Sequence, residues 1–244
     1  MIACSETVKL DGGDTYYEAH GSGEPLLLLH GWAQSSSIWK EYTDNFSDKF
    51  RVFSVDLYGH GRSSPFQGEF SLQKAADNLL QMMDYIGIDT AKAVGFSYGG
   101  ETLLNACVSQ SGRFTSMILI GSSHRWPRQK WGVSYDELDS SYKQQLSQIH
   151  IHGDEQIKQI FDQMPNYESV LTRSDLKRIS TNTLIMVGEH DQYVGPEVAL
   201  DMHNSLSNSH LWIVPHAGHV VFSGEMKSEF IRVSREFLSG KWDK

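Results

Sequence analysis

The stretch Gly95-Phe96-Ser97-Tyr98-Gly99 decides how this chain of 244 residues is interpreted. It ends an apolar run at residues 93–96 and opens a helix-like segment at 98–109, so its serine stands on a sharp turn from strand to helix. Flanking glycines permit such a tight turn, and the helix that follows directs the positive end of its dipole toward the serine. The pattern predicts that Ser97 is an exposed, pre-oriented nucleophile.

Around this turn, short apolar runs alternate with longer helix-like stretches. The runs are bounded by Gly, Pro or Asp, as buried parallel strands are, and cover 26–29, 52–55, 93–96, 117–120, 184–187 and 211–214. The helix-like stretches are 72–86, 98–109, 196–205 and 225–238, and residues 8–20 have the pattern of a hairpin. We therefore expect an α/β fold with a mostly parallel central sheet and helices on both faces.

A base and an orienting acid for this serine are predicted at two later strand ends. A serine hydroxyl is a weak nucleophile at neutral pH, so it needs both groups. The sequence GEHD occupies 188–191 and PHAGH occupies 215–219, each directly after an apolar run. Because the carboxyl ends of parallel strands gather at one edge of a sheet, we expect Ser97, Asp191 and His219 to converge. His216 competes with His219 for the role of base.

These motifs together resemble the α/β-hydrolase superfamily over nearly the whole chain. They are Gly-x-Ser-x-Gly at 95–99, Gly-Glu-His-Asp-x-x-Val at 188–194, Ala-Gly-His at 217–219, His-Gly-Trp at 30–32 and Asp-x-x-Gly-x-Gly-x-Ser at 56–63. The resemblance implies that His219 is the base, and that the backbone N–H groups of Trp32 and Tyr98 form the oxyanion hole. It also implies that no cofactor is needed. We expect His30 and His60 to be structural.

Residues 122–178 break the alternation of strands and helices. They contain no strand-like apolar run and are rich in aromatic residues, so we expect a helical lid inserted into a single domain over 1–244. Because ligand pockets are mostly apolar, Trp126, Trp131 and Tyr135 are the candidate substrate-binding residues. Glu101, two residues beyond the motif at 95–99, has no role that the sequence assigns.

Composition excludes several other classes of protein. The formal charge of −9 argues against a nucleic-acid surface, which needs clustered Lys and Arg. No apolar run approaches a membrane span, and the first ten residues do not have the pattern of a secretory signal, so a cytoplasmic location is expected. Cys4 and Cys107 are expected to be free thiols. Glu189, His190, His150 and His152 lack the close spacing of metal ligands, so no metal is expected.

The expected activity is hydrolysis of a carboxylic ester of small or medium acyl length through an acyl-enzyme. Lactonases, proline-releasing aminopeptidases and carbon–carbon bond hydrolases share the same three catalytic residues and stay open as alternatives. His-Gly-Trp at 30–32 and Ser122-Ser123 are also similar to the sequences of esterases that demethylate pimeloyl-acyl carrier protein. This resemblance implies that the carrier would dock on Arg125, Arg128 and Lys130. From another class of function, a small-molecule receptor with slow turnover could retain the same residues.

Overall fold

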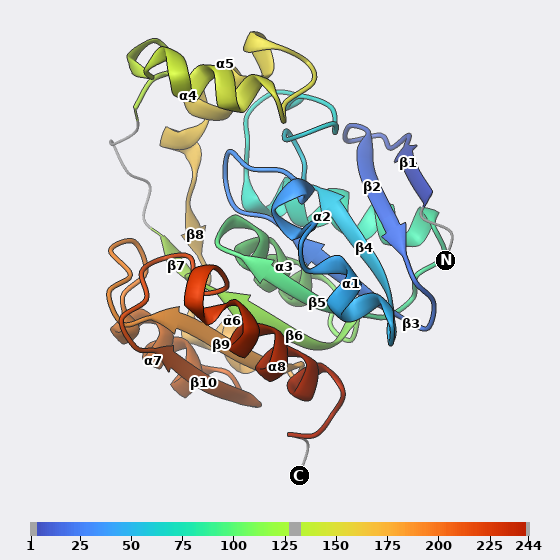
Figure 1. The fold of residues 1–244 in the computed structure, drawn as a ribbon, viewed down its shortest axis with the longest axis vertical. Coiled ribbons are helices and arrows are strands. Elements are labelled where there is room, and N and C mark those ends of the chain that lie inside the picture. The colour runs from blue at the N-terminus through green and yellow to red at the C-terminus, as the bar shows by residue number, and fades with distance from the viewer. Residues whose placement is uncertain (1–3, 127–132, 243–244) are drawn as a thin grey trace.

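The computed structural model describes residues 4–126 and 133–242, and an eight-stranded sheet forms the centre of the molecule (Figure 1). Its strands are β1 Cys4–Val8, β2 Thr15–His20, β3 Glu24–Leu29, β4 Phe50–Asp56, β5 Ala91–Phe96, β6 Phe114–Ile120, β9 Asn182–Gly188 and β10 Ser209–Val214. They lie in the order β1-β2-β4-β3-β5-β6-β9-β10. The pairs β1–β2 and β2–β4 are antiparallel, and the other pairs are parallel. The expected hairpin, strands and sheet type are confirmed.

Two hydrophobic cores, one on each face of this sheet, hold the helices. Alternate side chains of β3 point to opposite faces, so Leu27 and Leu29 enter one core and Leu26 and Leu28 enter the other. The first core packs against α2 Leu72–Tyr85, α3 Tyr98–Ser109 and α7 Pro196–Ser205, and the second against α1 Thr43–Ser47 and α8 Lys227–Leu238 (Figure 1). Helices on both faces are thereby confirmed. No helix among the described residues is long and apolar enough to cross a membrane.

Two short elements of the second core were not predicted. They are η1 Ser36–Trp39, a 3-10 helix whose N-cap is Ser35, and α1. Their sequences are short and largely polar, so neither shows a helical repeat of apolar residues. They form because Trp39 and Phe46 are fully buried against the sheet, which is a tertiary contact.

The segment predicted at 122–178, hereafter the insertion, lies between β6 and β9. It contains β7 Arg125–Trp126, η2 Tyr135–Glu137, α4 Ser140–Ser147, α5 Asp154–Asp162, η3 Met164–Asn166, β8 Ser169–Val170 and α6 Arg173–Lys177. The expectation that it lacks strands was wrong, because β7 and β8 pair antiparallel. Strands of two residues are too short to give an apolar run. In Figure 1, α4 and α5 lie at the top, above the sheet.

Buried polar side chains join the insertion to the loop that follows β4. The Nε2 atom of Gln156 lies 3.2 Å from each of three backbone oxygens, those of Gly59, Gly61 and Ser63. His150 accepts a hydrogen bond at Nδ1 from the N–H of Gly61, at 2.9 Å. Both side chains are almost completely buried. The insertion is thus fixed to the sheet domain by directional bonds as well as by apolar contact.

Candidate active site

Ser97 stands on a strained turn between β5 and α3. Its φ is +49°, a value uncommon outside glycine, and its N–H donates a 2.7 Å hydrogen bond to the carbonyl of Ile120 in β6. A Cβ on Gly99 would lie 2.7 Å from the carbonyl oxygen of Leu29, and one on Gly95 would meet the start of α3 at 2.5 Å. The two glycines are therefore required by close approach of the backbone, while the serine itself takes the left-handed conformation.

Asp191 and His219 are hydrogen bonded at the ends of β9 and β10. The carboxylate Oδ2 accepts a 2.8 Å bond from Nδ1 of His219, and Oδ1 accepts bonds from the N–H groups of Tyr193 at 2.9 Å and Val194 at 3.0 Å. Burial raises the pKa of Asp191, but these hydrogen bonds outweigh it and hold the pKa below its usual value. The ionised carboxylate fixes the imidazole with Nδ1 protonated, which leaves Nε2 as an acceptor.

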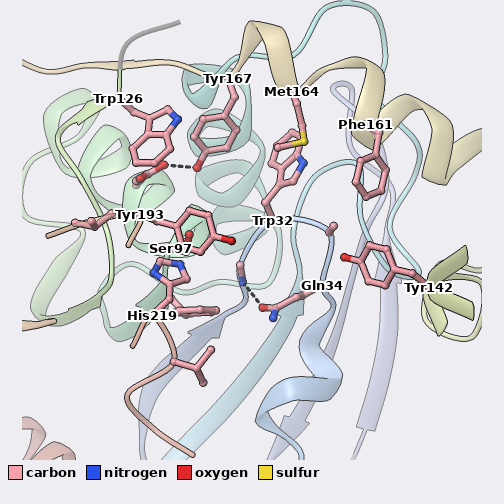
Figure 2. A pocket seen from close by; sticks show the side chains of 16 residues that line it. Trp32, Gln34, Ser97, Trp126, Tyr142, Phe161, Met164, Tyr167, Tyr193 and His219 are labelled. Carbon is pink, nitrogen blue, oxygen red and sulfur yellow. Dashed lines mark hydrogen bonds between the residues drawn. The ribbon is translucent and has the colours of Figure 1, made fainter. Parts of the chain in front are cut away.

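Ser97 and His219 line the same pocket (Figure 2). The imidazole packs against the two strand ends that hold the serine. Its ring centroid lies 4.9 Å from that of Phe96, and a Cβ on Gly121 would lie 2.9 Å from the Cε1 and Nδ1 atoms of the imidazole. The three side chains expected to converge therefore gather at one edge of the sheet. The other histidine considered as base, His216, is exposed and is not among the residues that line the pocket.

The two backbone amides expected to form an oxyanion hole belong to a loop after β3 and to the first turn of α3. Tyr98 is the first residue of α3, where N–H groups have no acceptor within the helix. Trp32 lies in a turn closed by a 3.2 Å bond from the Gln34 N–H to the Gly31 carbonyl. A second bond, from the Gly31 N–H to Oε1 of Gln34, closes the same turn at 3.0 Å (Figure 2). The orientation of the Trp32 peptide is thus set by the turn.

The pocket has a volume of about 340 Å³ and is mainly aromatic and apolar. Its upper wall in Figure 2 comes from the insertion. The described residues that line it are Gly31, Trp32, Ala33, Gln34, Phe96, Ser97, Glu101, Trp126, Tyr142, Phe161, Met164, Tyr167, Tyr193, Val194, His219 and Val220. Sequence reasoning did not single out Tyr142, Phe161, Met164 or Tyr167 as pocket residues. They lie in α4, in α5, in η3 and at the residue that follows η3, so no local motif marks them.

Of the three residues proposed from the sequence to bind substrate, the structure describes Trp126 and Tyr135, and Trp126 lines this pocket. Tyr135 does not, and that expectation is corrected. A capping box between Ser134 and Glu137 starts η2 at Tyr135, and the ring packs beneath the ammonium of Lys143, 4.5 Å from it. Trp131 lies outside the described residues, as do Arg128 and Lys130.

Glu101 is the residue of this site that sequence reasoning left without a role. It lies one turn into α3, is 3% exposed, and lines the pocket. Its Oε1 accepts a 3.2 Å bond from the N–H of Ser123, and its Oε2 accepts a bond from the hydroxyl of Tyr167. Burial raises the pKa of Glu101 to about 7, although these bonds and the nearby His219 oppose the shift.

His30, His60 and His150 form a buried cluster behind the pocket. The ring centroids of His30 and His60 are 5.5 Å apart, and those of His60 and His150 are 5.9 Å apart. His30 accepts the N–H of Leu57 at Nε2, at 2.9 Å, so its Nδ1 carries the proton and donates to the Gly31 carbonyl. Burial lowers the pKa of His30 to about 4 and that of the other two imidazoles below the usual value. These contacts fit a structural role.

The four residues considered as metal ligands do not form one group. His150 is buried against Gly61, whereas Glu189 and His190 are exposed on the loop after β9. Among the described residues, the one group able to converge on a cation is Glu189, His190 and His216, whose ligand atoms lie within 4.8 Å of one another. All three are exposed at the surface, beside the loop of Asp191 and outside the pocket.

The sequence matches a known protein family and resembles known esterases. The family described as alpha/beta hydrolase fold matches residues 24–149. The chain is 26% identical to a pimeloyl-[acyl-carrier protein] methyl ester esterase of Vibrio cholerae, over 87% of this chain and 94% of that protein. A protein of the same name from Nitrosomonas europaea is also 26% identical, over 85% of this chain and 93% of that one.

Solved structures show the same fold at lower identity. The meta-cleavage product hydrolase CumD of Pseudomonas fluorescens matches with a TM-score of 0.82 and 21% identity, covering 97% of this chain and 98% of that chain. The esterase RhEst1 of Rhodococcus matches with a TM-score of 0.78 and 22% identity, covering 98% and 99%. At these identities the structural likeness establishes the fold and not the reaction.

Proposed function

The chain belongs to the alpha/beta hydrolase family, and from this premise we propose that it hydrolyses carboxylic esters with Ser97 as nucleophile, His219 as base and Asp191 as the group that orients the base. The observation that carries the proposal is the Asp191–His219 hydrogen bond at the edge of a pocket that also contains Ser97. A serine on a strained turn, beside an imidazole whose acceptor nitrogen is free to take its proton, is the arrangement that acyl transfer requires.

In the first half of the proposed reaction, the Ser97 Oγ attacks the ester carbonyl carbon while Nε2 of His219 takes the hydroxyl proton. The carbonyl oxygen becomes an oxyanion, which the N–H groups of Trp32 and Tyr98 would stabilise. Loss of one such donor typically costs about 3 kcal/mol of transition-state stabilisation. When the tetrahedral intermediate collapses, the bond to the alcohol oxygen breaks and the imidazolium returns its proton to the departing alcohol.

In the second half, water replaces the alcohol. Nε2 of His219 takes a proton from water as its oxygen attacks the acyl-enzyme, and then returns that proton to the Ser97 Oγ as the carboxylic acid leaves. Throughout, the low pKa of Asp191 keeps it ionised, so it stabilises the imidazolium without accepting its proton. The sequence of steps consumes one ester and one water and regenerates the free serine.

The pocket supports an ester with a small or medium acyl group. Its volume of about 340 Å³ is at the lower end of ligand sites, and its walls are mainly apolar. Five of the described lining side chains come from the insertion, which we propose acts as a lid that selects the substrate. They are Trp126, Tyr142, Phe161, Met164 and Tyr167.

A methyl ester carried by an acyl carrier protein is a second candidate substrate. The observation that favours it is the similarity, at 26% identity over most of the chain, to esterases named for that substrate. Arg125, the described member of the basic group expected to receive the carrier, is exposed in β7, next to the pocket residue Trp126. The relatives thus support ester hydrolysis as the reaction class, and they leave the acyl group to be determined.

The test compares the native protein with Ser97→Ala on p-nitrophenyl esters graded by acyl length, with lactones and amino-acid amides as alternative substrates. We expect sustained hydrolysis of short and medium esters by the native protein. Turnover by Ser97→Ala should fall by roughly a factor of 10⁶ toward the uncatalysed rate. Circular dichroism and the melting temperature check that the variant is folded. Unreduced turnover by the variant would refute the assignment, and a single slow acylation by the native protein would instead support a receptor.

A further inference from the structure

Glu101 places a buried acid in the wall of a mainly apolar pocket. It is the one carboxyl group among the described lining residues, and none of those residues is Lys or Arg. Asp191, which orients His219, is not among them. The proposed esterase reaction does not use Glu101, because the proton transfers are complete with His219 and Asp191. A carboxyl group that is not needed for the chemistry, yet faces the substrate, requires a different explanation.

The position of Glu101 on α3 ties it to the reacting centre. Ser97 is the N-cap of α3, and its carbonyl accepts a 3.1 Å hydrogen bond from the N–H of Glu101, so Glu101 stands one helical turn from Ser97. Both side chains line the same pocket, so a substrate bound at Ser97 would also be exposed to this carboxyl. Glu101 is thus placed to distinguish substrates by the group that they carry close to the scissile bond.

The hydrogen bonds of Glu101 bring no positive charge to it, and the nearby imidazole of His219 offsets its raised pKa only in part. Both of its partners, the N–H of Ser123 and the hydroxyl of Tyr167, are neutral donors. Within residues 4–126 and 133–242, no Lys or Arg forms an ion pair with it. A carboxylate has about four acceptor positions, and two of these are filled. Because a buried charge is costly unless it is paired, a cation arriving in the pocket would supply the missing partner.

The surrounding rings favour the same kind of ligand. Tyr167 bonds directly to Glu101, at the dashed line in Figure 2, and Trp126 and Trp32 line the same pocket. Aromatic faces attract ammonium groups through their quadrupole, most strongly where water is excluded. A carboxylate in a pocket lined by aromatic rings is a combination of groups that binds an organic cation. An anionic substrate group would meet repulsion there, with no basic side chain among the described lining residues to compensate it.

We propose that Glu101 is a specificity-determining residue that binds an ammonium group on the ester substrate, so that the preferred substrates are amino-substituted carboxylic esters. The inference rests on the proposed esterase function and names the substrate class of the same pocket. The elevated pKa of Glu101, about 7, agrees with a carboxyl that has no permanent counter-ion. Tyr167 and Ser123 then act as positioning residues that direct the carboxyl toward the ligand.

The experiment measures binding separately from turnover. Ser97→Ala protein is titrated calorimetrically with two matched pairs of methyl esters, in which an ammonium replaces a methyl group of similar size. One pair is the methyl ester of β-alanine with methyl butanoate, and the other is the methyl ester of ε-aminocaproic acid with methyl heptanoate. We expect the ammonium member to bind roughly tenfold or more tightly in at least one pair, as one desolvated charge pair would provide. In the double variant Ser97→Ala, Glu101→Gln, that preference should be abolished.

Two further variants separate recognition from a structural role. Tyr167→Phe removes one of the hydrogen bonds that position Glu101 but keeps the carboxyl, so the preference for the ammonium ester should weaken but persist. If Glu101 merely anchored Tyr167, Glu101→Gln and Tyr167→Phe would have the same effect on the preference. Glu225→Gln removes the same unit of charge from an exposed position outside the pocket, and should leave the preference unchanged.

The inference is overturned if Ser97→Ala protein binds the two members of both pairs equally, prefers the neutral members or binds none of the esters. It is also overturned if the preference remains when Glu101→Gln is added. Its failure is distinct from that of the proposed function, which native protein tests by turnover. Selective binding without hydrolysis would reject the esterase and keep the cation site. Hydrolysis of all four esters without preference would keep the esterase and reject the cation site.

Discussion

At the scale of single residues, the surroundings give side chains of the same type different roles. His219 has one nitrogen hydrogen bonded to Asp191 and the other on the side of the pocket, whereas His216 is exposed and interacts through its backbone N–H with Glu189. Glu189 is exposed, whereas Glu101 is buried with a pKa raised to about 7. Neither difference can be read from residue type alone.

Removing each of the two neighbouring imidazoles tests the assignment of the base. His219→Ala should reduce kcat for ester hydrolysis on the order of 10⁶-fold, because the hydroxyl of Ser97 then has no proton acceptor. His216→Ala is the matched control on the same loop, and should change kcat less than about threefold because His216 does not line the pocket. A reversed result in steady-state assays would assign the base to His216.

At the scale of elements, the junction between β5 and α3 depends on how closely the backbones approach. Gly99 packs directly on the end of β3, where an added Cβ would lie 2.7 Å from both the Cβ and the carbonyl oxygen of Leu29. Backbone atoms cannot move aside as a flexible side chain can. The helix that carries Ser97 is therefore held at a distance from the sheet that only glycine allows at this position.

Gly99→Ala should consequently destabilise the protein and displace the nucleophile together. We expect a loss of about 1–3 kcal/mol in the free energy of unfolding, the usual cost of overpacking a core, and a loss of esterase activity larger than the unfolded fraction explains. Gly12→Ala is the control, since a Cβ there meets no atom within 4 Å. Urea denaturation and kcat measured on both variants check this. Equal behaviour of the two would show that the close approach has no consequence.

At the scale of the whole molecule, the histidine cluster connects the insertion to the sheet. His150 comes from the insertion, and His30 and His60 come from the loops after β3 and β4. Burial lowers the pKa of all three imidazoles, that of His30 to about 4. Because unfolded histidine titrates near 6.5, the unfolded chain binds more protons below that pH, and stability is lost as the pH falls through this window.

When the pH is lowered from 7 to 5, the free energy of unfolding should fall by roughly 2 kcal/mol for each of these imidazoles that stays neutral in the folded protein. Glu101 acts in the opposite direction, because its raised pKa favours the folded state as the pH falls, but it is one group against three. His150→Gln should make the pH dependence of the free energy of unfolding shallower. His152 is exposed, so His152→Gln should leave that dependence unchanged. Urea titrations at the two pH values measure this. An unaltered slope in His150→Gln would contradict the role given to the cluster.

The sequence by itself determined the strands, the main helices and the turn at Ser97, because each depends on a pattern within one short segment. Apolar runs bounded by Gly or Asp identified the strands, whereas the order of the strands in the sheet comes from the structure. The placement of Ser97, Asp191 and His219 at one edge also followed, since parallel strands bring their carboxyl ends together. In contrast, η1, α1, β7 and β8 are too short for any repeat to reveal them.

Only the tertiary structure decided what lines the pocket. Tyr142, Phe161 and Tyr167 reach it from separate elements of the insertion, while Tyr135, which has the same aromatic character, packs against Lys143 instead. The isolation of Glu101 among neutral partners likewise depends on Tyr167, which lies 66 residues further along the chain. Local periodicity fixes which face of an element is apolar, but the neighbours of that face are set when distant segments pack together, and specificity depends on those neighbours.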